Sequence, residues 1–246
     1  MDCCNESGDA SRSSPARAPE AIAVASYTDG DQRPSSSSHR GRRALPPRGA
    51  AAAVCAGIVL GWVAMTTTYA ALLRGINVSG SRRVPMPELR DVLTGLGHTG
   101  IATYLQSGNA VFRSDREDEN ALAADLRKAL HQRFGFAVDC LVRDSGYLAA
   151  VADACPFPAA ELAGKQLHVT YFDRPVDADR FADLDAPAFL PEEFRLGDRC
   201  LYLYAPDGLG RSKLADALGR PRHTKGLTAT TRNWNTVAKL VEMTRV

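Results

Sequence analysis

The stretch from Asn120 to Gly135 reads NALAADLRKALHQRFG, and the spacing of its leucines decides the fold. Leu122, Leu126 and Leu130 repeat at the interval that places side chains on one face of an α-helix. Gly135 follows the last apolar residue and favours a helix end there. The pattern predicts an amphipathic helix over residues 120–134 that buries one face.

Short apolar segments lie on both sides of this helix. The turn cluster Ser107-Gly108-Asn109 separates two predicted strands and is typical of a hairpin. Helical periodicity ending at a glycine predicts an earlier helix, and apolar runs predict the first and last strands. The predicted elements are strand 69–74, helix 87–96, strands 101–106 and 110–113, helix 120–134, strand 136–142 and helix 145–154.

The same order of elements recurs farther along the chain. Leu122 and Leu126 lie 92 residues before Leu214 and Leu218, and Gly135 lies 91 residues before Gly226. A constant spacing of this kind indicates a structural duplication. The second set is predicted as strand 167–172, helix 177–184, strands 194–196 and 200–204, helix 212–218, strand 227–230 and helix 233–243.

The order strand, helix, two strands, helix, strand is the ferredoxin-like pattern, a four-stranded antiparallel sheet with helices on one face. The sequence therefore predicts an α+β fold with two tandem ferredoxin-like halves, residues 69–143 and 166–246, plus a C-terminal helix. A helix at 145–154 joins them. Because a half of this size is small for independent stability, we expect the two to pack into one compact unit.

The composition is that of an ordinary soluble protein. The chain has 246 residues, 45% of them hydrophobic and 24% charged, and a formal net charge of +2. A nearly neutral protein lacks the strong positive field of a general nucleic-acid binder. Six cysteines without a CxxC pair indicate free thiols in a reducing compartment rather than a disulfide or metal framework.

Residues 1–64 differ in character from the rest. Residues 1–50 are rich in Ser, Pro, Arg and Ala, a composition that favours disorder. An apolar run at 50–64 follows several arginines, as in a signal peptide or membrane anchor, but is short for a spanning helix. We expect that translation starts at Met65, which gives a cytoplasmic protein of residues 65–246 without membrane contact. A membrane anchor or export segment and a disordered tail are the alternatives.

Five segments of the chain stand out, AALLRGINV (70–78), PMPEL (85–89), TYLQSGN (103–109), GRSKL (210–214) and TRNWNTVAKL (231–240). Together they strongly resemble the bacterial domain-of-unknown-function 1697 (DUF1697) family. The resemblance spans residues 69–246 and implies a soluble bacterial protein with two ferredoxin-like halves. The family carries no established activity, so the resemblance transfers no catalytic residue. The chain departs from the family pattern in its long N-terminal extension.

A first set of polar residues is predicted to converge at one edge of the first sheet. The end of the first strand and the start of the third lie at the same edge in this fold, and Arg74 at the strand end needs a partner or a ligand. An amide-rich ligand site is one interpretation, and turn formers that bond nearby backbone are the other. The residues are Arg74, Asn77, Gln106, Ser107 and Asn109.

A second set lies where two loops lead into helices. Free backbone N–H groups at a helix start favour an anion, and arginine and lysine side chains stand beside them here. The alternative is that Ser212 and Asn233 are N-caps and that the cations are solvated. The nucleotide-phosphate loop GxxxxGK[ST] is absent. The residues are Arg211, Ser212, Lys213, Arg232, Asn233, Asn235 and Thr236.

No catalytic or metal-binding motif is recognisable, so the sequence leaves open whether the chain is an enzyme. His98, His131, His168 and His223 lack a paired motif, and each is interpreted as structural. We expect neither a metal nor a cofactor.

Three hypotheses of function remain. The first is binding of a small anionic ligand, such as a phosphate compound or a nucleotide, at the polar helix N-termini. The second is single-stranded nucleic-acid binding through Tyr202 and Tyr204, which share one face of a strand, although packing of both against the other half is the simpler interpretation. The third is a structural or interaction module without a ligand. The sequence does not indicate the oligomeric state.

Overall fold

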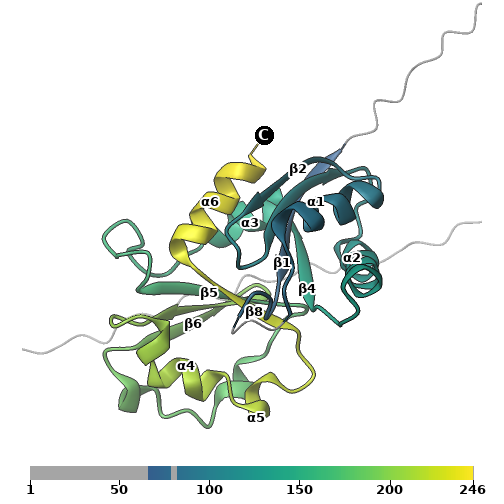
Figure 1. Ribbon diagram of the computed structural model, residues 1–246. Helices are drawn as coiled ribbons and strands as arrows, with labels where there is room; N and C mark the ends of the chain where they lie inside the picture. The colour runs from purple at the N-terminus through teal and green to yellow at the C-terminus, as the bar shows by residue number, and fades with distance from the viewer. Residues whose placement is uncertain (1–65, 79–81, 246) are drawn as a thin grey trace, which may run out of the picture. The chain divides into compact units, whose positions relative to one another are not determined.

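The computed structural model describes residues 66–78 and 82–245, which lie in a unit that spans Val59–Val246. Two four-stranded antiparallel sheets, each with helices, make up the described region (Figure 1). The expectations for residues 1–64, including the apolar run at 50–64, lie outside the described residues. No helix of the described residues is both long and apolar enough to cross a membrane.

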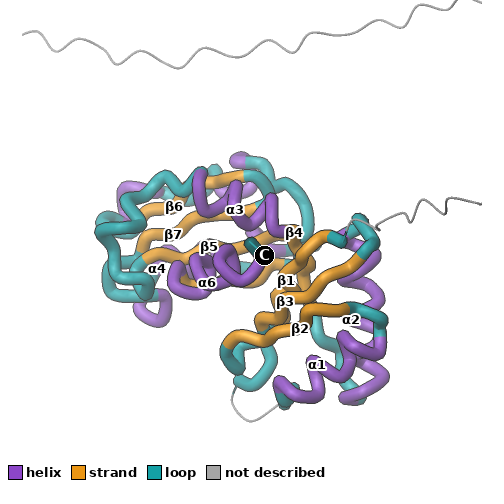
Figure 2. The backbone as a smooth tube through the Cα atoms, turned by 90° about the horizontal axis from the view of Figure 1, so that it is seen from above, coloured by secondary structure: helices purple, strands orange, loops and turns teal. Residues whose placement is uncertain are grey.

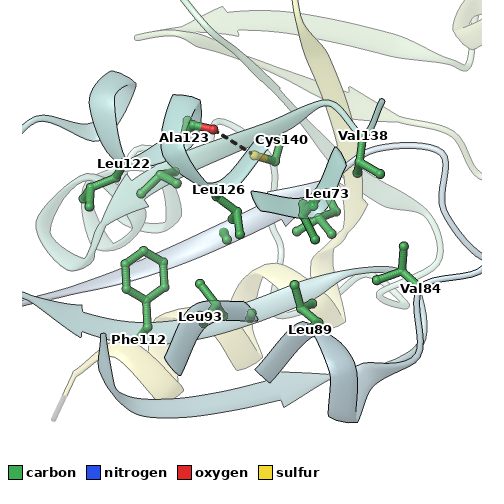
Figure 3. Close-up of a cluster of buried hydrophobic side chains, with 14 of the residues drawn as sticks. Leu73, Val84, Leu89, Leu93, Phe112, Leu122, Ala123, Leu126, Val138 and Cys140 are labelled. Carbon is green, nitrogen blue, oxygen red and sulfur yellow. Dashed lines mark hydrogen bonds between the residues drawn. The ribbon is translucent and has the colours of Figure 1, made fainter. Parts of the chain in front are cut away.

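The first sheet has the strand order β2-β3-β1-β4, with β1 and β3 in the centre. Two helices, α1 (Met86–Gly95) and α2 (Glu119–Phe134), cover one of its faces. Figure 3 shows Leu89 and Leu93 of α1 and Leu122 and Leu126 of α2 converging in this core. The strands are β1 (Thr67–Leu73), β2 (Thr99–Tyr104), β3 (Asn109–Ser114) and β4 (Cys140–Asp144).

Local signals set the ends of α2 and the β2–β3 turn. The Asp118 side chain accepts hydrogen bonds from two backbone N–H groups at the start of α2, and Gly135 ends the helix at φ +78°. Gly108, at φ +82°, lies under the end of β1. A Cβ atom on it would come within 2.8 Å of Leu73 Cβ and 2.7 Å of Ile76 Cδ1, so both the conformation and the space require glycine.

The second sheet repeats this arrangement with the order β6-β7-β5-β8, so the predicted α+β fold with two ferredoxin-like halves is confirmed. Its helical cover is shorter than that of the first half. The strands are β5 (Leu167–Phe172), β6 (Glu193–Gly197), β7 (Cys200–Tyr204) and β8 (Ala229–Asn233). The helices are η1 (Ala178–Phe181), η2 (Ala186–Phe189), η3 (Leu209–Arg211), α4 (Lys213–Leu218) and α5 (Pro221–Thr224).

Some predicted elements of the second half were wrong in length or position. The helix expected at 177–184 is a single 3₁₀ turn, because Phe181 is its one fully buried side chain and a longer helix would have little apolar surface to bury. The last strand lies two to three residues later than the predicted 227–230, and the short helix α5 was not predicted at all.

A second core joins the two halves. Helices α3 (Ser145–Asp153) and α6 (Trp234–Thr244) follow β4 and β8 respectively and pack against each other (Figure 2). Leu148 of α3 and Leu240 of α6 are fully buried in this core, between Ala70 of the first sheet and Val169 of the second. The two sheets therefore share one apolar interior on the faces that α1, α2 and α4 do not cover.

Two buried arginines connect the halves reciprocally. Arg143 is the second-to-last residue of β4, and Arg232 is the second-to-last residue of β8. Arg143 Nη2 donates to the backbone oxygen of Phe172, the last residue of β5, and Arg232 Nη2 donates to that of Leu73, the last residue of β1, at 2.6 Å. Each half therefore bonds the equivalent atom of the other.

Candidate ligand pocket

A pocket of about 590 Å³ lies in the second half, between the sheet and α4 and α5. Figure 1 shows these two helices on the opposite face of the second sheet from α6. The walls combine apolar and polar side chains, and the volume is within the range of about 300–1,000 Å³ that small-molecule sites occupy. The larger apolar side chains of the walls are Phe172, Phe181, Leu201, Leu203, Leu209 and Leu218.

The pocket follows from the shorter helical cover of the second half. In the first half, α1 has 10 residues and α2 has 16, and their side chains fill the space over the sheet. In the second half the corresponding cover is η1 with 4 residues and α4 with 6, followed by α5 with 4. Less helix over a sheet of equal strand number leaves a space over the strands.

Arg232 lines this pocket and is almost fully buried, at 8% exposure. All five of its N–H groups point at oxygen atoms of neutral groups. Nε donates to Asn109 Oδ1 at 2.6 Å, and the two terminal nitrogens donate to Thr230 Oγ1 and to three backbone oxygens. Among the described residues Arg232 forms no ion pair with a carboxylate. Burial lowers its pKa to about 10, so the cation persists at neutral pH as an uncompensated charge.

Arg74 is the second arginine at this pocket and is exposed. Its backbone N–H donates to Asp139 O at 2.8 Å, and its guanidinium makes no hydrogen bond or ion pair with the described residues. The donors of Arg74 are therefore available to a ligand, whereas those of Arg232 are already used.

His223 of α5 is a third polar residue in the wall and is 1% exposed in its side chain. Nδ1 lies 2.8 Å from Ala217 O of α4, and Nε2 lies 2.7 Å from Asp183 Oδ1. The hydrogen bond from His223 holds the pKa of the Asp183 carboxyl below its usual range. This contact connects the segment after η1 with α4 and α5, the parts of the chain that cover the pocket.

The first predicted polar set is divided by the structure. Asn77 donates to the backbone oxygens of Val84 and Gln106 and accepts from the Val84 N–H group. Asn109 donates to Tyr104 O and Ser107 Oγ and accepts from Arg232. Both amides are therefore fully bonded within the protein, and Arg74 is the member of this set that lines the pocket.

At α4 the predicted anion position is taken by a carboxylate of the protein itself. Glu192 Oε2 accepts from Leu214 N at 2.7 Å and from Ser212 Oγ at 2.9 Å, and Ser212 caps the helix through Ala215 N. Arg211 and Lys213 beside it are exposed. The N-terminus of this helix is satisfied without a ligand.

The predicted site residues at the start of α6 also make their contacts within the protein. Asn233 caps α6 by accepting from the backbone N–H and the hydroxyl of Thr236, at 3.0 and 2.8 Å. Asn235 is exposed and lies against Gly164, where an added Cβ would come 1.9 Å from Asn235 Oδ1. Arg232 is the member of the second set that lines the pocket, and its bond to Asn109 joins the two sets.

The tyrosines of β7 do not form an open aromatic platform. Tyr202 is buried in the shared core, where its hydroxyl donates to Val151 O at 2.7 Å, and Tyr204 lies with its ring centre 6.0 Å from that of Phe157. The described residues contain no group of three or more metal-ligating side chains. Burial raises the pKa of the Cys140 thiol to about 12 and that of Cys200 to about 11, so both stay protonated at neutral pH.

The sequence did not reveal three contributors to this region. His223 finds its partner Asp183 forty residues earlier, Glu192 caps a helix twenty residues later, and Phe181 lines a pocket that exists because a predicted helix is short. Charged side chains near helix starts were visible signals, but no local pattern indicates which distant group meets them.

Comparisons with known proteins agree with the fold. The structure of a conserved bacterial protein, SP0830 from Streptococcus pneumoniae, is similar with a TM-score of 0.60 and 23% sequence identity. The match covers 73% of this chain and 99% of that protein. No curated protein matches the chain. The family model described as "Protein of unknown function (DUF1697)" matches residues 65–202, more than half of the chain, and the protein therefore belongs to the DUF1697 family, as its sequence motifs indicated.

Proposed function

We propose that the protein binds a small amphipathic anion, an apolar molecule that carries one carboxylate or a similar acidic group, in the pocket of the second half. The observation that carries this proposal is a buried cation, Arg232, that lines the pocket and has no carboxylate partner among the described residues. A buried unpaired charge is costly, so an anion close to it lowers the free energy of the bound state.

The two arginines would have different roles. Arg232 has no free donor and acts on the ligand through its charge, over a short distance and away from water. Arg74 lines the pocket, its guanidinium has no partner in the part of the chain that the structure describes, and it can donate two parallel hydrogen bonds to a carboxylate. Together they favour an anionic head group near the first half.

The walls favour an apolar body over a bare inorganic anion. Leu209 of η3, at 37% exposure, and the buried side chains of Phe181 and Leu218 line the pocket with carbon atoms. Burial of apolar surface contributes about 25 cal/mol per Å², so a ligand of eight carbons gains affinity that phosphate cannot. This differs from the earlier expectation of phosphate at helix N-termini, since Glu192 already fills the α4 position.

A matched ligand series tests the proposal. Thermal unfolding of the full chain is measured with octanoate, with octanol and with inorganic phosphate. At about a hundredfold excess over its Kd, octanoate is expected to raise the Tm by about 5 °C or more. Octanol, which has the same chain without the charge, and phosphate, which has the charge without the chain, should each have a smaller effect.

Two variants locate the binding. Ala215→Phe places a ring in the pocket, because Ala215 lines it, and should abolish the octanoate shift. Ala124→Phe, on the exposed side of α2, is the control and should keep the shift. If octanoate leaves the Tm unchanged, or if Ala215→Phe retains the full shift, the pocket is not the ligand site, and a module without a ligand becomes the better description.

A further inference from the structure

The hydrogen bonds of His223 define its protonation state in the described structure. Both ring nitrogens lie within 2.8 Å of oxygen atoms, Ala217 O and Asp183 Oδ1. A backbone oxygen and an ionised carboxylate can only accept, whereas a neutral imidazole carries one N–H group. Both contacts are hydrogen bonds when the ring carries both protons. The geometry therefore corresponds to an imidazolium.

The charged groups around the ring come from each segment that packs against it. Asp183, from the segment after η1, attracts the second proton, and its other oxygen pairs with Arg222 at 2.7 Å. Arg180 of η1 donates to the backbone oxygen of His223 at 3.2 Å, and its charge opposes that proton, as does Arg222. Phe181 contributes an apolar wall, with its ring centre 5.5 Å from that of His223.

His223 also lines the proposed ligand pocket, where Arg232, Arg74 and Asp216 are the charged neighbours. We infer that anion binding in this pocket is linked to protonation of His223, so that the protein takes up its ligand at lower pH and releases it as the pH rises. This inference deepens the proposed function and rests on it.

Two physical effects produce the linkage. The imidazolium adds a positive charge to the pocket wall, and an anion in the pocket in turn stabilises the imidazolium, since coupling between two sites is reciprocal. Loss of one proton also removes one of the two hydrogen bonds that hold the pocket cover, either to α4 or to the segment after η1. Both effects weaken anion binding as the pH rises and His223 loses a proton.

The protonation state can be read without any ligand. In ¹⁵N NMR spectra of the full chain at about pH 5.5, both His223 ring nitrogens should have the chemical shift of a protonated nitrogen. Asp183→Asn should shift the loss of the second proton to lower pH, because the carboxylate that favours the imidazolium is gone. A neutral ring at the lower pH overturns the inference.

The linkage itself is measured with 8-anilinonaphthalene-1-sulfonate, an aromatic anion whose sulfonate stays ionised over the range used. Its Kd, from fluorescence, should be at least about fivefold weaker at about pH 8 than at about pH 5.5, the lower end of ordinary coupling between sites. His223→Gln should remove this difference. His131→Gln, on the exposed face of α2, is the matched control and should retain it.

The outcomes separate the inference from the proposed function. Equal affinity at the two pH values in the unsubstituted chain overturns the proton linkage but leaves the pocket as a ligand site. Absence of probe binding at both pH values, or binding that Ala215→Phe does not reduce, overturns the proposed function and the linkage with it. If circular dichroism shows that His223→Gln does not fold, Asp183→Asn replaces it as the test variant, because Asp183 is at the surface. The affinity of the Asp183→Asn protein for the probe should then weaken at a lower pH than that of the unsubstituted chain.

Discussion

Single residues in this protein carry contacts between distant parts of the chain. Arg232 bonds atoms that lie 123 to 159 positions earlier, in β1, β3 and the turn before β3. Gly108 lies in the same turn and leaves room for Leu73 and Ile76. Substitution of Arg232 should therefore destabilise the protein through lost hydrogen bonds, and substitution of Gly108 through steric overlap.

Arg232→Met removes a buried cation but also orphans its acceptors. Replacing a buried charge by an apolar side chain can be neutral when the acceptors find new donors. Here Leu73 O and Asn109 Oδ1 are buried and lose the donor, and each orphaned buried acceptor costs about 1–3 kcal/mol. We expect the free energy of unfolding in urea to fall by about 3 kcal/mol. Arg83→Met, at an exposed position, is the control, and an Arg232→Met protein as stable as this control would contradict the argument.

Gly108→Ala and Gly135→Ala separate backbone conformation from steric overlap. Both glycines have a positive φ, +82° and +78°, but a Cβ on Gly135 would meet nothing within 4 Å. Gly135→Ala should cost about 1 kcal/mol for the left-handed conformation alone. Gly108→Ala adds the overlap with Leu73 and should cost about 2–4 kcal/mol. Equal losses in thermal or urea unfolding would mean that the turn moves freely to make room.

At the scale of elements, the helices of the two halves differ although the strands correspond. The helix at 120–134 was predicted almost to the residue, because Leu122, Leu126 and Leu130 mark its face and Gly135 its end. The helix at 177–184 was wrong, because Phe181 and Leu184 give too little periodic apolar surface to distinguish a helix from a single turn. Sequence patterns locate helices with a regular apolar face. The pocket instead forms where the helices over the second sheet are short, and no such pattern marks that place.

Stability of α4 depends on an acidic residue outside the helix. Glu192 accepts from Ser212 Oγ and Leu214 N at the helix start, where a negative charge is also favoured by the helix dipole. Glu192→Gln keeps the shape but removes the charge, and should lower the free energy of unfolding by about 1 kcal/mol. The control is Glu193→Gln, whose carboxylate pairs with Arg195 at the surface and should matter less. A loss no larger than that of the control would show that the contact with α4 contributes little.

For the molecule as a whole, the shared core couples the stability of the two halves. Leu240 of α6 is fully buried between the first and the second sheet. Leu240→Ala should cost about 2–5 kcal/mol, the usual range for a buried leucine. Because the core is common, amide hydrogens of both β1 and β5 should lose protection against exchange to a similar degree. Loss of protection confined to β5 would mean that the halves unfold independently.

The sequence predicted the fold better than the pocket, and the reason is physical. Strand order and helix periodicity arise from local patterns, so two ferredoxin-like halves could be inferred from one chain. The sequence singled out Arg74 and Arg232 as cations, but it placed Arg232 in a loop, whereas the structure places it in β8. Packing between the halves brings its donors to the oxygens of Leu73 and Gly108. A local sequence pattern does not indicate contacts between residues that lie more than a hundred positions apart.

The reciprocal bonds of Arg143 and Arg232 have a consequence for how the two copies can differ. In twofold-symmetric dimers of identical subunits, each contact from the first subunit to the second is repeated from the second to the first. In a dimer, any residue lost from one subunit is lost from both. Here residues 154–166 tether the copies, which keeps them together at a high effective concentration, and each copy has its own sequence. The first copy can therefore retain its long helices as a stable support while the second gives up helix turns and gains an open space over its sheet.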